Sequence, residues 1–285
     1  MKPFLKSSAK PALLFLSLII CIATIGCKAG IEPTYKEKDL PYLLQKICKD
    51  EYGLEVIAQK TPTTIWLYIP LEKILHKDYG VKPDKYFDEA VWDKVRNILT
   101  TIGRVLISSD KTPEFFVMTA SDINLGIDYS LVGSVLDLKK SYANFIPWTE
   151  ANRRFVIRWK LAPEAVGDLH GEHIKPYDIQ LPDFLAEQIA QRISGIFIDE
   201  SIKNYFKVER SEGRFESGSF YFEYAIRQIA QPKKEIDTKK RILDVIAYCI
   251  KTYEFKDFLG VTIVDGLTQD KLDLNQTAIL ERRID

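Results

Sequence analysis

Residues 86–107, YFDEAVWDKVRNILTTIGRVLI, hold the most regular hydrophobic pattern in this chain of 285 residues. Apolar side chains recur there at steps of three or four, which places them on one face of an α-helix. The members of this face are Phe87, Val91, Val95, Ile98, Ile102 and Val105, with Trp92 and Leu99 widening it. The stretch therefore predicts an amphipathic helix.

Shorter segments around this helix predict an alternation of helices and strands. Before residue 161 the expected elements are a helix at 39–52, strands at 55–59, 64–69 and 114–119, a weaker helical stretch at 130–140 and a strand at 153–161. After residue 182 they are a helix from 183, a strand at 214–230, a helix at 237–253, a strand at 259–264 and a final element at 270–282. No repeat of fixed period is visible.

This order favours the α+β class, with mostly antiparallel sheets and helices packed on one face. Residues 161–182 hold several prolines and glycines with little periodicity, and they are the expected boundary. The expected organisation is an N-terminal domain at 39–160, a linker loop at 161–182 and a C-terminal domain at 183–285. A chain of this length can bury one large core or two modest ones, so the number of domains stays open.

The N-terminal 26 residues have the composition of a secretory signal. Lys2, Lys6 and Lys10 precede an apolar run at 11–25, and the segment contains no acidic residue. The run is shorter than the roughly 20 residues that a permanent membrane-spanning helix needs. A basic start followed by a short apolar run is typical of a segment that is removed after export.

The end of this segment, Ala23-Thr24-Ile25-Gly26-Cys27, resembles the signal of bacterial lipoproteins. The resemblance covers residues 1–27 only, and Thr24 departs from it by standing where leucine is commonest. It implies cleavage after Gly26, acylation of Cys27 and a tether at 27–38. It also implies a protein held in the cell envelope facing the periplasm. Lys28 favours the outer membrane over the inner one, because an aspartate after the cysteine is the usual inner-membrane signal.

Charge argues against a nucleic-acid partner. The whole chain has 40 basic and 40 acidic residues, and removal of the lysine-containing leader leaves a mildly acidic protein. Proteins that bind nucleic acids present a basic surface. The expected partners are the membrane, through the anchor, and an envelope protein or an anionic ligand.

Two cysteines, Cys48 and Cys249, remain outside the leader. An oxidising compartment would permit a disulfide between them. Each also lies on an apolar helical stripe, which favours two separate buried thiols.

Two clusters could bind a ligand. Arg154, Arg158 and Lys160 alternate along one predicted strand, beside Arg153, and could meet an anionic group; a solvated face paired with acids is the simpler reading. His170 and His173 could bind zinc, but their spacing matches no common metal motif and they lie in the linker, where a solvated loop is the simpler reading.

The sequence contains neither a nucleophilic-serine motif nor a glycine-rich phosphate loop. The expected function is therefore a non-catalytic binding or scaffolding module anchored in the envelope. One alternative is an envelope hydrolase with a site built from distant carboxylates or from the loop of His170 and His173. Another is a carrier of a lipid or other apolar ligand.

Overall fold

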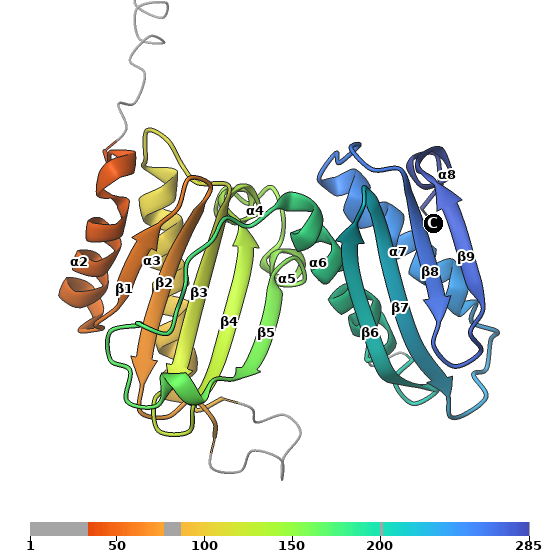
Figure 1. Cartoon of the computed structure of the whole chain (residues 1–285), viewed down its shortest axis with the longest axis horizontal. Coiled ribbons are helices and arrows are strands. Elements are labelled where there is room, and N and C mark those ends of the chain that lie inside the picture. The colour runs from red at the N-terminus through yellow and green to blue at the C-terminus, as the bar shows by residue number, and fades with distance from the viewer. Residues whose placement is uncertain (1–33, 77–86, 200–201, 285) are drawn as a thin grey trace, which may run out of the picture.

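The computed structural model describes residues 34–76, 87–199 and 202–284. These residues form two units side by side, each built on its own sheet (Figure 1). We call residues 34–161 the first unit, residues 162–180 the connecting segment and residues 181–284 the second unit. The predicted α+β class is confirmed.

The first unit has a sheet of five strands in the order β1-β2-β3-β4-β5. Strands β2 and β3 are parallel and the other neighbours are antiparallel, so the sheet is mixed. Its elements are a 3₁₀ turn at Glu37–Asp39, α2 (Leu40–Tyr52), β1 (Ile57–Lys60), β2 (Thr64–Leu71), α3 (Glu89–Ile107), β3 (Phe115–Asp122), β4 (Ile127–Ser134), α4 (Val135–Tyr142), α5 (Trp148–Asn152) and β5 (Val156–Leu161).

The second unit has a sheet of four strands in the order β6-β7-β8-β9, in which only β7 and β8 are parallel. The connecting segment before it holds a 3₁₀ turn at Pro163–Ala165. The elements of the second unit are α6 (Leu181–Phe197), β6 (Phe206–Glu216), β7 (Ser219–Gln228), α7 (Thr238–Thr252), β8 (Gly260–Asp265), β9 (Lys271–Asn275) and α8 (Gln276–Leu280).

The two units share one order of elements. Each begins with a helix, continues with an antiparallel strand pair, crosses over through a second helix, adds another antiparallel pair and then a third helix. The crossover helix, α3 or α7, joins the two parallel strands, as a parallel connection requires. The chain thus repeats a topology without repeating a sequence.

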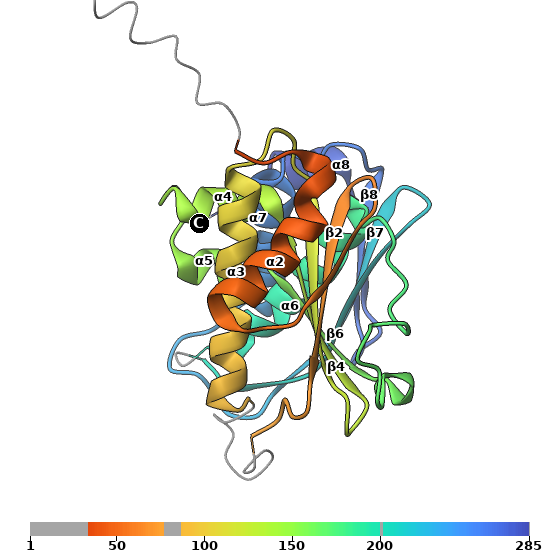
Figure 2. The ribbon, with the colours of Figure 1, turned by 90° about the vertical axis from the view of Figure 1, so that its left-hand side faces the viewer.

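The main core of the first unit lies between the sheet and helices α2, α3 and α4 (Figure 2). The stripe predicted for residues 86–107 supplies the α3 side of this core. Its buried members are Val91, Val95, Ile98, Leu99, Ile102 and Val105, whereas Trp92 is exposed. Ile65, Leu67 and Ile69 of β2 face it from the sheet. Gly103 allows α4 to pack closely, because a Cβ there would lie 2.0 Å from the ring of Tyr142.

The opposite face of the first sheet is covered by the connecting segment, which runs on the side away from the helices (Figure 2). Trp66 lies on this face and donates from Nε1 to the carbonyl of Tyr177 at 2.9 Å. The Asp178 carboxylate accepts from the Thr63 amide at 2.8 Å, and the Ile179 amide donates to Thr64 Oγ1 at 2.9 Å. Strands β2, β3 and β4 are therefore largely buried on both faces, whereas the edge strand β5 is mostly exposed.

The second sheet is covered on one face only. Phe220, Phe222 and Tyr224 of β7 pack against α6 and α7 in one core. The other face carries charged pairs such as Arg210 with Glu223, at 2.9 Å. Along β6 partly buried and exposed positions alternate through much of the strand, as expected where one face meets water.

Two expected elements were wrong. Residues 127–134 form strand β4 rather than the start of a helix, because β4 lies inside the sheet and is buried on both faces, which removes the alternation of period two. The strand expected at 214–230 is the end of a hairpin whose first strand begins at Phe206. Its turn places Ser217 and Gly218 at φ of 50° and 77°, as a two-residue hairpin turn requires.

Cys48 and Cys249 are free, buried thiols in the separate cores of the two units, which confirms the prediction of two unpaired cysteines. The leader and Cys27 lie outside the described residues. Among the helices that are described, none has both the length and the apolar character needed to span a bilayer.

Candidate functional site

The three cations predicted to meet an anion each contact a carboxylate of the chain itself. Arg158 binds both carboxylate oxygens of Glu187 at 2.7 Å and donates to the Tyr177 hydroxyl at 2.9 Å. Lys160 is exposed and pairs with Glu164 at 2.9 Å. Arg154 is buried, so of the three it is the least accessible to a ligand.

Arg154 is the centre of a buried polar network between the two units. Its guanidinium donates to Asp137 of α4 at 2.8 Å, to Glu150 of α5 at 3.0 Å and to the hydroxyl of Tyr248 of α7 at 3.3 Å. The hydroxyl of Tyr253 donates to the other oxygen of Asp137. A buried cation is tolerated only when its hydrogen bonds are satisfied, and these contacts provide that.

Glu150 is the carboxylate on which several of these donors converge. It accepts from both terminal nitrogens of Arg192 at 3.0 and 2.9 Å, and from the Tyr248 hydroxyl at 2.7 Å. Burial acts to raise the pKa of Glu150, but the hydrogen bonds from Arg192, Tyr248 and Arg154 outweigh it and lower the pKa to about 2. The carboxylate is therefore ionised and fully engaged at neutral pH.

Helix α6 carries the remaining contacts between the units. The side chain of Gln191 accepts from the Ile157 amide at 2.9 Å and donates to the Ile157 carbonyl at 2.6 Å. It thereby pairs with the outer edge of β5 as a neighbouring strand would. Gln188 donates to the Arg154 carbonyl at 2.6 Å. These bonds, together with the Arg154 network, fix the second unit against the first.

The predicted histidine pair is divided between solvent and interior. His173 is buried, with Nδ1 2.5 Å from Asp168 and Nε2 3.2 Å from Asp128. Ser121 donates to the second oxygen of Asp128. The backbone amides of His170 and His173 both donate to the carboxylate of Asp168. Burial acts to raise the pKa of Asp168, but these bonds outweigh it and hold the pKa well below its usual range.

This arrangement ties the connecting segment to the first sheet. Both ring nitrogens of His173 are within hydrogen-bond distance of carboxylates, while the exposed His170 lines a different surface hollow beside α2. Among the described residues, no group of three or more His, Cys, Asp or Glu side chains is arranged to hold a metal ion.

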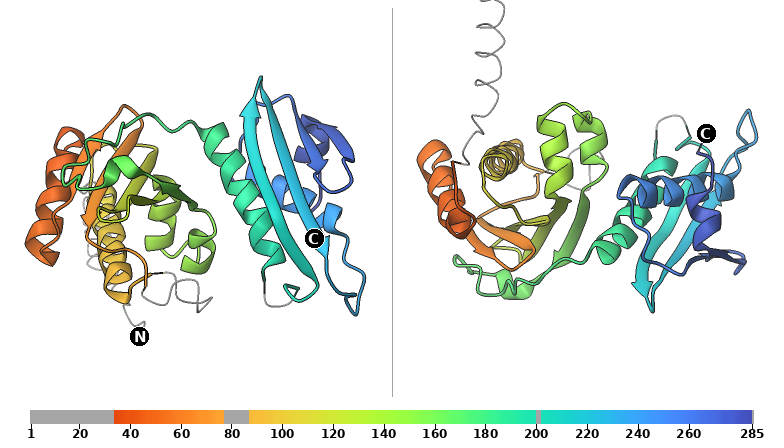
Figure 3. Two further views of the ribbon diagram at one scale, coloured as in Figure 1. Left: turned by 60° about the horizontal axis from the view of Figure 1, so that its bottom comes forward. Right: turned by 90° about the horizontal axis from the view of Figure 1, so that it is seen from above.

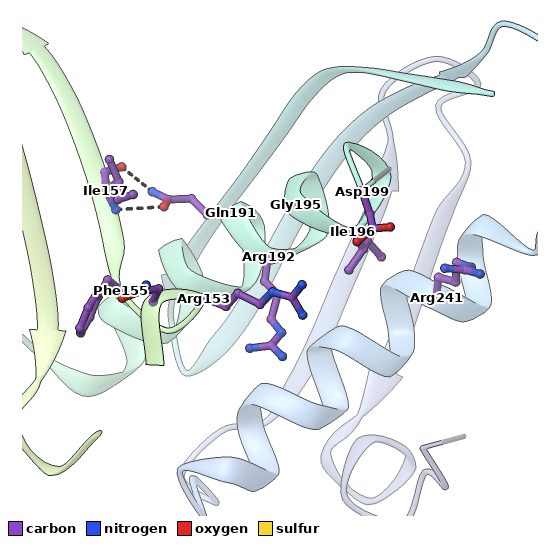
Figure 4. A pocket seen from close by; sticks show the side chains of 10 residues that line it. Arg153, Phe155, Ile157, Gln191, Arg192, Gly195, Ile196, Asp199 and Arg241 are labelled. Atoms are coloured by element: carbon purple, nitrogen blue, oxygen red, sulfur yellow. Dashed lines mark hydrogen bonds between the residues drawn. The ribbon is translucent and has the colours of Figure 1, made fainter. Parts of the chain in front are cut away.

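The candidate ligand site is a pocket between the units, with a volume of about 440 Å³ (Figure 4). We call it the inter-unit pocket. Its walls come from the α5–β5 connection, from α6 and from α7, and polar and apolar atoms both contribute to its surface. It is lined by Asn152, Arg153, Phe155, Ile157, Gln191, Arg192, Gly195, Ile196, Asp199 and Arg241.

Three arginines line this pocket, one from each wall. Arg192 is bound to Glu150, as described above. Arg153 and Arg241 are exposed, and neither forms an ion pair with any residue that the structure describes. Two guanidinium groups without a carboxylate partner can each offer a planar pair of donors to a carboxylate or phosphate.

The sequence predicted Arg154, Arg158 and Lys160 as the residues that meet an anion, whereas an exposed arginine that lines the pocket is the neighbouring Arg153. Arg153 was noted only as a neighbour of the predicted cations, because the alternation of the strand drew attention to Arg154, Arg158 and Lys160. Arg192 and Arg241 lie on helices 49 residues apart in sequence, so no local pattern could join them to Arg153. Comparison with protein-family models, curated proteins and solved structures finds no match to this chain.

Proposed function

We propose that this chain is a non-catalytic binding module of the cell envelope, anchored by acylation of Cys27 and facing the periplasm. Lys28 favours the outer membrane. The ligand or partner presents an anionic group to the inter-unit pocket. The observation that carries this proposal is the pair of exposed arginines, Arg153 and Arg241, on opposite walls of one pocket and without ion pairs among the described residues.

The electrostatics of the pocket favour an anion. Two guanidinium groups on opposite walls of a cleft repel each other. A carboxylate or phosphate bound between them replaces this repulsion with attraction and charge-assisted hydrogen bonds. Arg192 adds positive charge, although Glu150 offsets it. Among the described residues that line the pocket, Asp199 is the only acidic one.

Binding is favoured over hydrolysis by the state of the nearby carboxylate. A general acid needs a proton to donate near neutral pH, and a general base needs a free lone pair within reach of the reacting group. The low pKa of Glu150 leaves it without a proton, and its oxygens already accept from two arginines and a tyrosine. It is arranged to hold the units together.

Inorganic phosphate is a suitable probe of the site. We expect phosphate, compared with chloride at equal ionic strength, to raise the thermal unfolding midpoint of the full chain, because a ligand that binds only the folded state stabilises it. Combining Arg153→Ala with Arg241→Ala should weaken phosphate binding by roughly 10-fold or more, since each charge-assisted hydrogen bond is worth about 1.5–3 kcal/mol.

Arg96→Ala is the matched control, because Arg96 is an exposed arginine on α3 with a surface ion pair to Asp93. It should leave the phosphate effect unchanged. If the double variant bound phosphate as tightly as the parent chain, the inter-unit pocket would not be the anion site and the proposal would fail.

A further inference from the structure

The most exposed apolar surface of the first unit lies around the end of α3 and the turn that follows α4. We call it the apolar patch. Phe145 is 80% exposed there, and a groove of about 850 Å³ with mainly apolar walls runs beside it. The ring of Trp148 contacts Tyr142 edge-on, with centroids 5.3 Å apart, and extends the patch. Its members are Ile107, Leu136, Tyr142, Phe145, Ile146 and Trp148, with Lys139 and Lys140 at the rim.

The patch lies next to the point where the N-terminal segment joins the unit. Ile107 is the last residue of α3, and Tyr35 pairs with Ser109 two residues later. The Tyr35 amide donates to the Ser108 carbonyl at 3.1 Å, and the Asp110 amide donates to the Tyr35 carbonyl at 3.0 Å. Figure 1 shows the start of the described chain and α4 at the same end of the first unit.

The pairing of Tyr35 with the end of α3 limits how far the first unit can lie from an anchor at Cys27. Cys27 precedes Tyr35 by eight residues, and an extended chain spans at most about 3.3–3.6 Å per residue. An acylated Cys27 would therefore hold the Tyr35 end of the first unit within roughly 30 Å of the bilayer. The end that carries the apolar patch is the end that such a tether brings to the membrane.

We propose that the apolar patch binds the surface of the lipid bilayer in which Cys27 is anchored, with Phe145 and Trp148 inserted at the level of the headgroups. This inference rests on the lipid anchor of the proposed function. Aromatic side chains have an apolar body suited to that depth, and lysines at the rim can extend their ammonium groups to anionic headgroups. Burial lowers the pKa of Lys139, as expected for an ammonium on an apolar surface.

The lysines also favour a bilayer over a second copy of the chain. A two-fold contact would place the same patch on both partners, and Lys139 and Lys140 of each copy would then lie near those of the other. Of the described residues that line the groove, none is acidic and able to neutralise these lysines. An anionic lipid surface supplies the missing negative charge.

The test uses the acylated full chain in vesicles of phosphatidylethanolamine and phosphatidylglycerol, with brominated acyl chains as a quencher. An environment-sensitive fluorophore is placed at Phe145→Cys and, in the control, at Leu161→Cys. Leu161 is 78% exposed and lies at the opposite end of the sheet, paired with Ile127. Cys48 and Cys249 should not react, because burial raises the pKa of these thiols to about 11 and about 12.

We expect brominated lipid to quench the probe at residue 145 and leave the probe at residue 161 unquenched. Combining Lys139→Glu with Lys140→Glu should abolish the quenching. Mass spectrometry shows independently whether Cys27 is acylated. If Cys27 is acylated but the probe at residue 145 is not quenched, the membrane contact of the patch is overturned and the anchor is not. If Cys27 is unmodified, the anchor itself is overturned. Protection of residue 145 from aqueous iodide that grows with protein concentration in detergent would assign the patch to a second copy and overturn the inference.

Discussion

The two sheets share a four-strand arrangement, to which the first adds β5, but they differ in how they meet water. In the first, helices cover one face, and the connecting segment together with Phe184 of α6 covers the other, so the central strands are buried on both faces (Figure 2). The second has helices on one face (Figure 3), while its opposite face carries partly exposed arginine–glutamate pairs such as Arg210 with Glu223. One order of helices and strands thus supports a two-layer unit and a three-layer unit.

The third layer of the first unit is an irregular segment rather than a helix. It is held because its polar groups find partners: Asp178 accepts from Thr63, and the carbonyl of Asp168 accepts from the Tyr68 hydroxyl at 2.6 Å. A loop that covers apolar surface must satisfy its backbone in this way. The first sheet is therefore covered on its second face because side chains of β2 bind the connecting segment, and the described chain has no such segment over β7.

The largest expected effect comes from a matched pair of aromatic residues. Trp66 of β2 and Tyr221 of β7 occupy the second strand of their sheets and point away from the helices. Trp66→Ala should lower the free energy of unfolding by about 3–5 kcal/mol, because it empties a packed site and removes the bond to Tyr177. Tyr221→Ala should cost about 1 kcal/mol or less, since its main contact is Arg214 above the ring. Urea unfolding measures both.

Equal losses for the two variants would contradict the account of the covered and open faces. A smaller loss for Trp66→Ala would mean that the connecting segment contributes little to the stability of the first unit. Trp66→Phe is a useful control, because it keeps most of the apolar volume and removes only the indole donor.

Much of the fold could be predicted from the sequence where one face of an element is apolar. The stripe on α3 identified a helix, and the helix expected at 39–52 corresponds to α2, which ends at Gly53 in the left-handed conformation. The secondary-structure prediction failed at β4, because burial of both faces of that strand removes the alternation of apolar and polar residues. It also failed at the hairpin of β6 and β7, because Ser217-Gly218 is not among the strongest hairpin signals.

The candidate site was only partly accessible to sequence reasoning. The strand of Arg154 and Arg158 was recognised as a source of cations, but partner choice is a property of three dimensions. Asp137 and Glu187 lie 17 and 29 residues from Arg154 and Arg158, the arginines that they bind. Local spacing cannot reveal such pairs, nor which neighbouring arginine is left without one.

A second prediction concerns the contact between the units. The pKa of Glu150, about 2 in the folded chain, lies below its ordinary value near 4.5. Its ionised form therefore stabilises the fold above about pH 4.5, and this contribution is lost as the pH falls towards 2. Glu150→Gln should lower the free energy of unfolding at neutral pH by about 1–3 kcal/mol. It should also flatten the loss of stability between about pH 5 and pH 2 in an acid titration.

Glu164→Gln is the control for that titration, because Glu164 pairs with Lys160 on the exposed surface, where water screens the interaction. Glu164→Gln should change the loss of stability between about pH 5 and pH 2 far less. If Glu150→Gln left this loss of stability unchanged, the Arg154 network would not depend on the Glu150 carboxylate.

The smallest expected effects come from two glycines inside helices, and they have opposite signs. Gly103 of α3 lies beneath the ring of Tyr142, so Gly103→Ala should cost about 1–3 kcal/mol by forcing α4 away. Gly195 of α6 has no atom within 4 Å of an added Cβ, so Gly195→Ala should stabilise by about 0.5–1 kcal/mol through helix propensity alone. Thermal unfolding of the two variants would test whether α4 is in direct packing contact with α3. If Gly103→Ala proved stabilising, α4 would be a loosely attached helix, and the apolar patch that it carries would not be held in a fixed position.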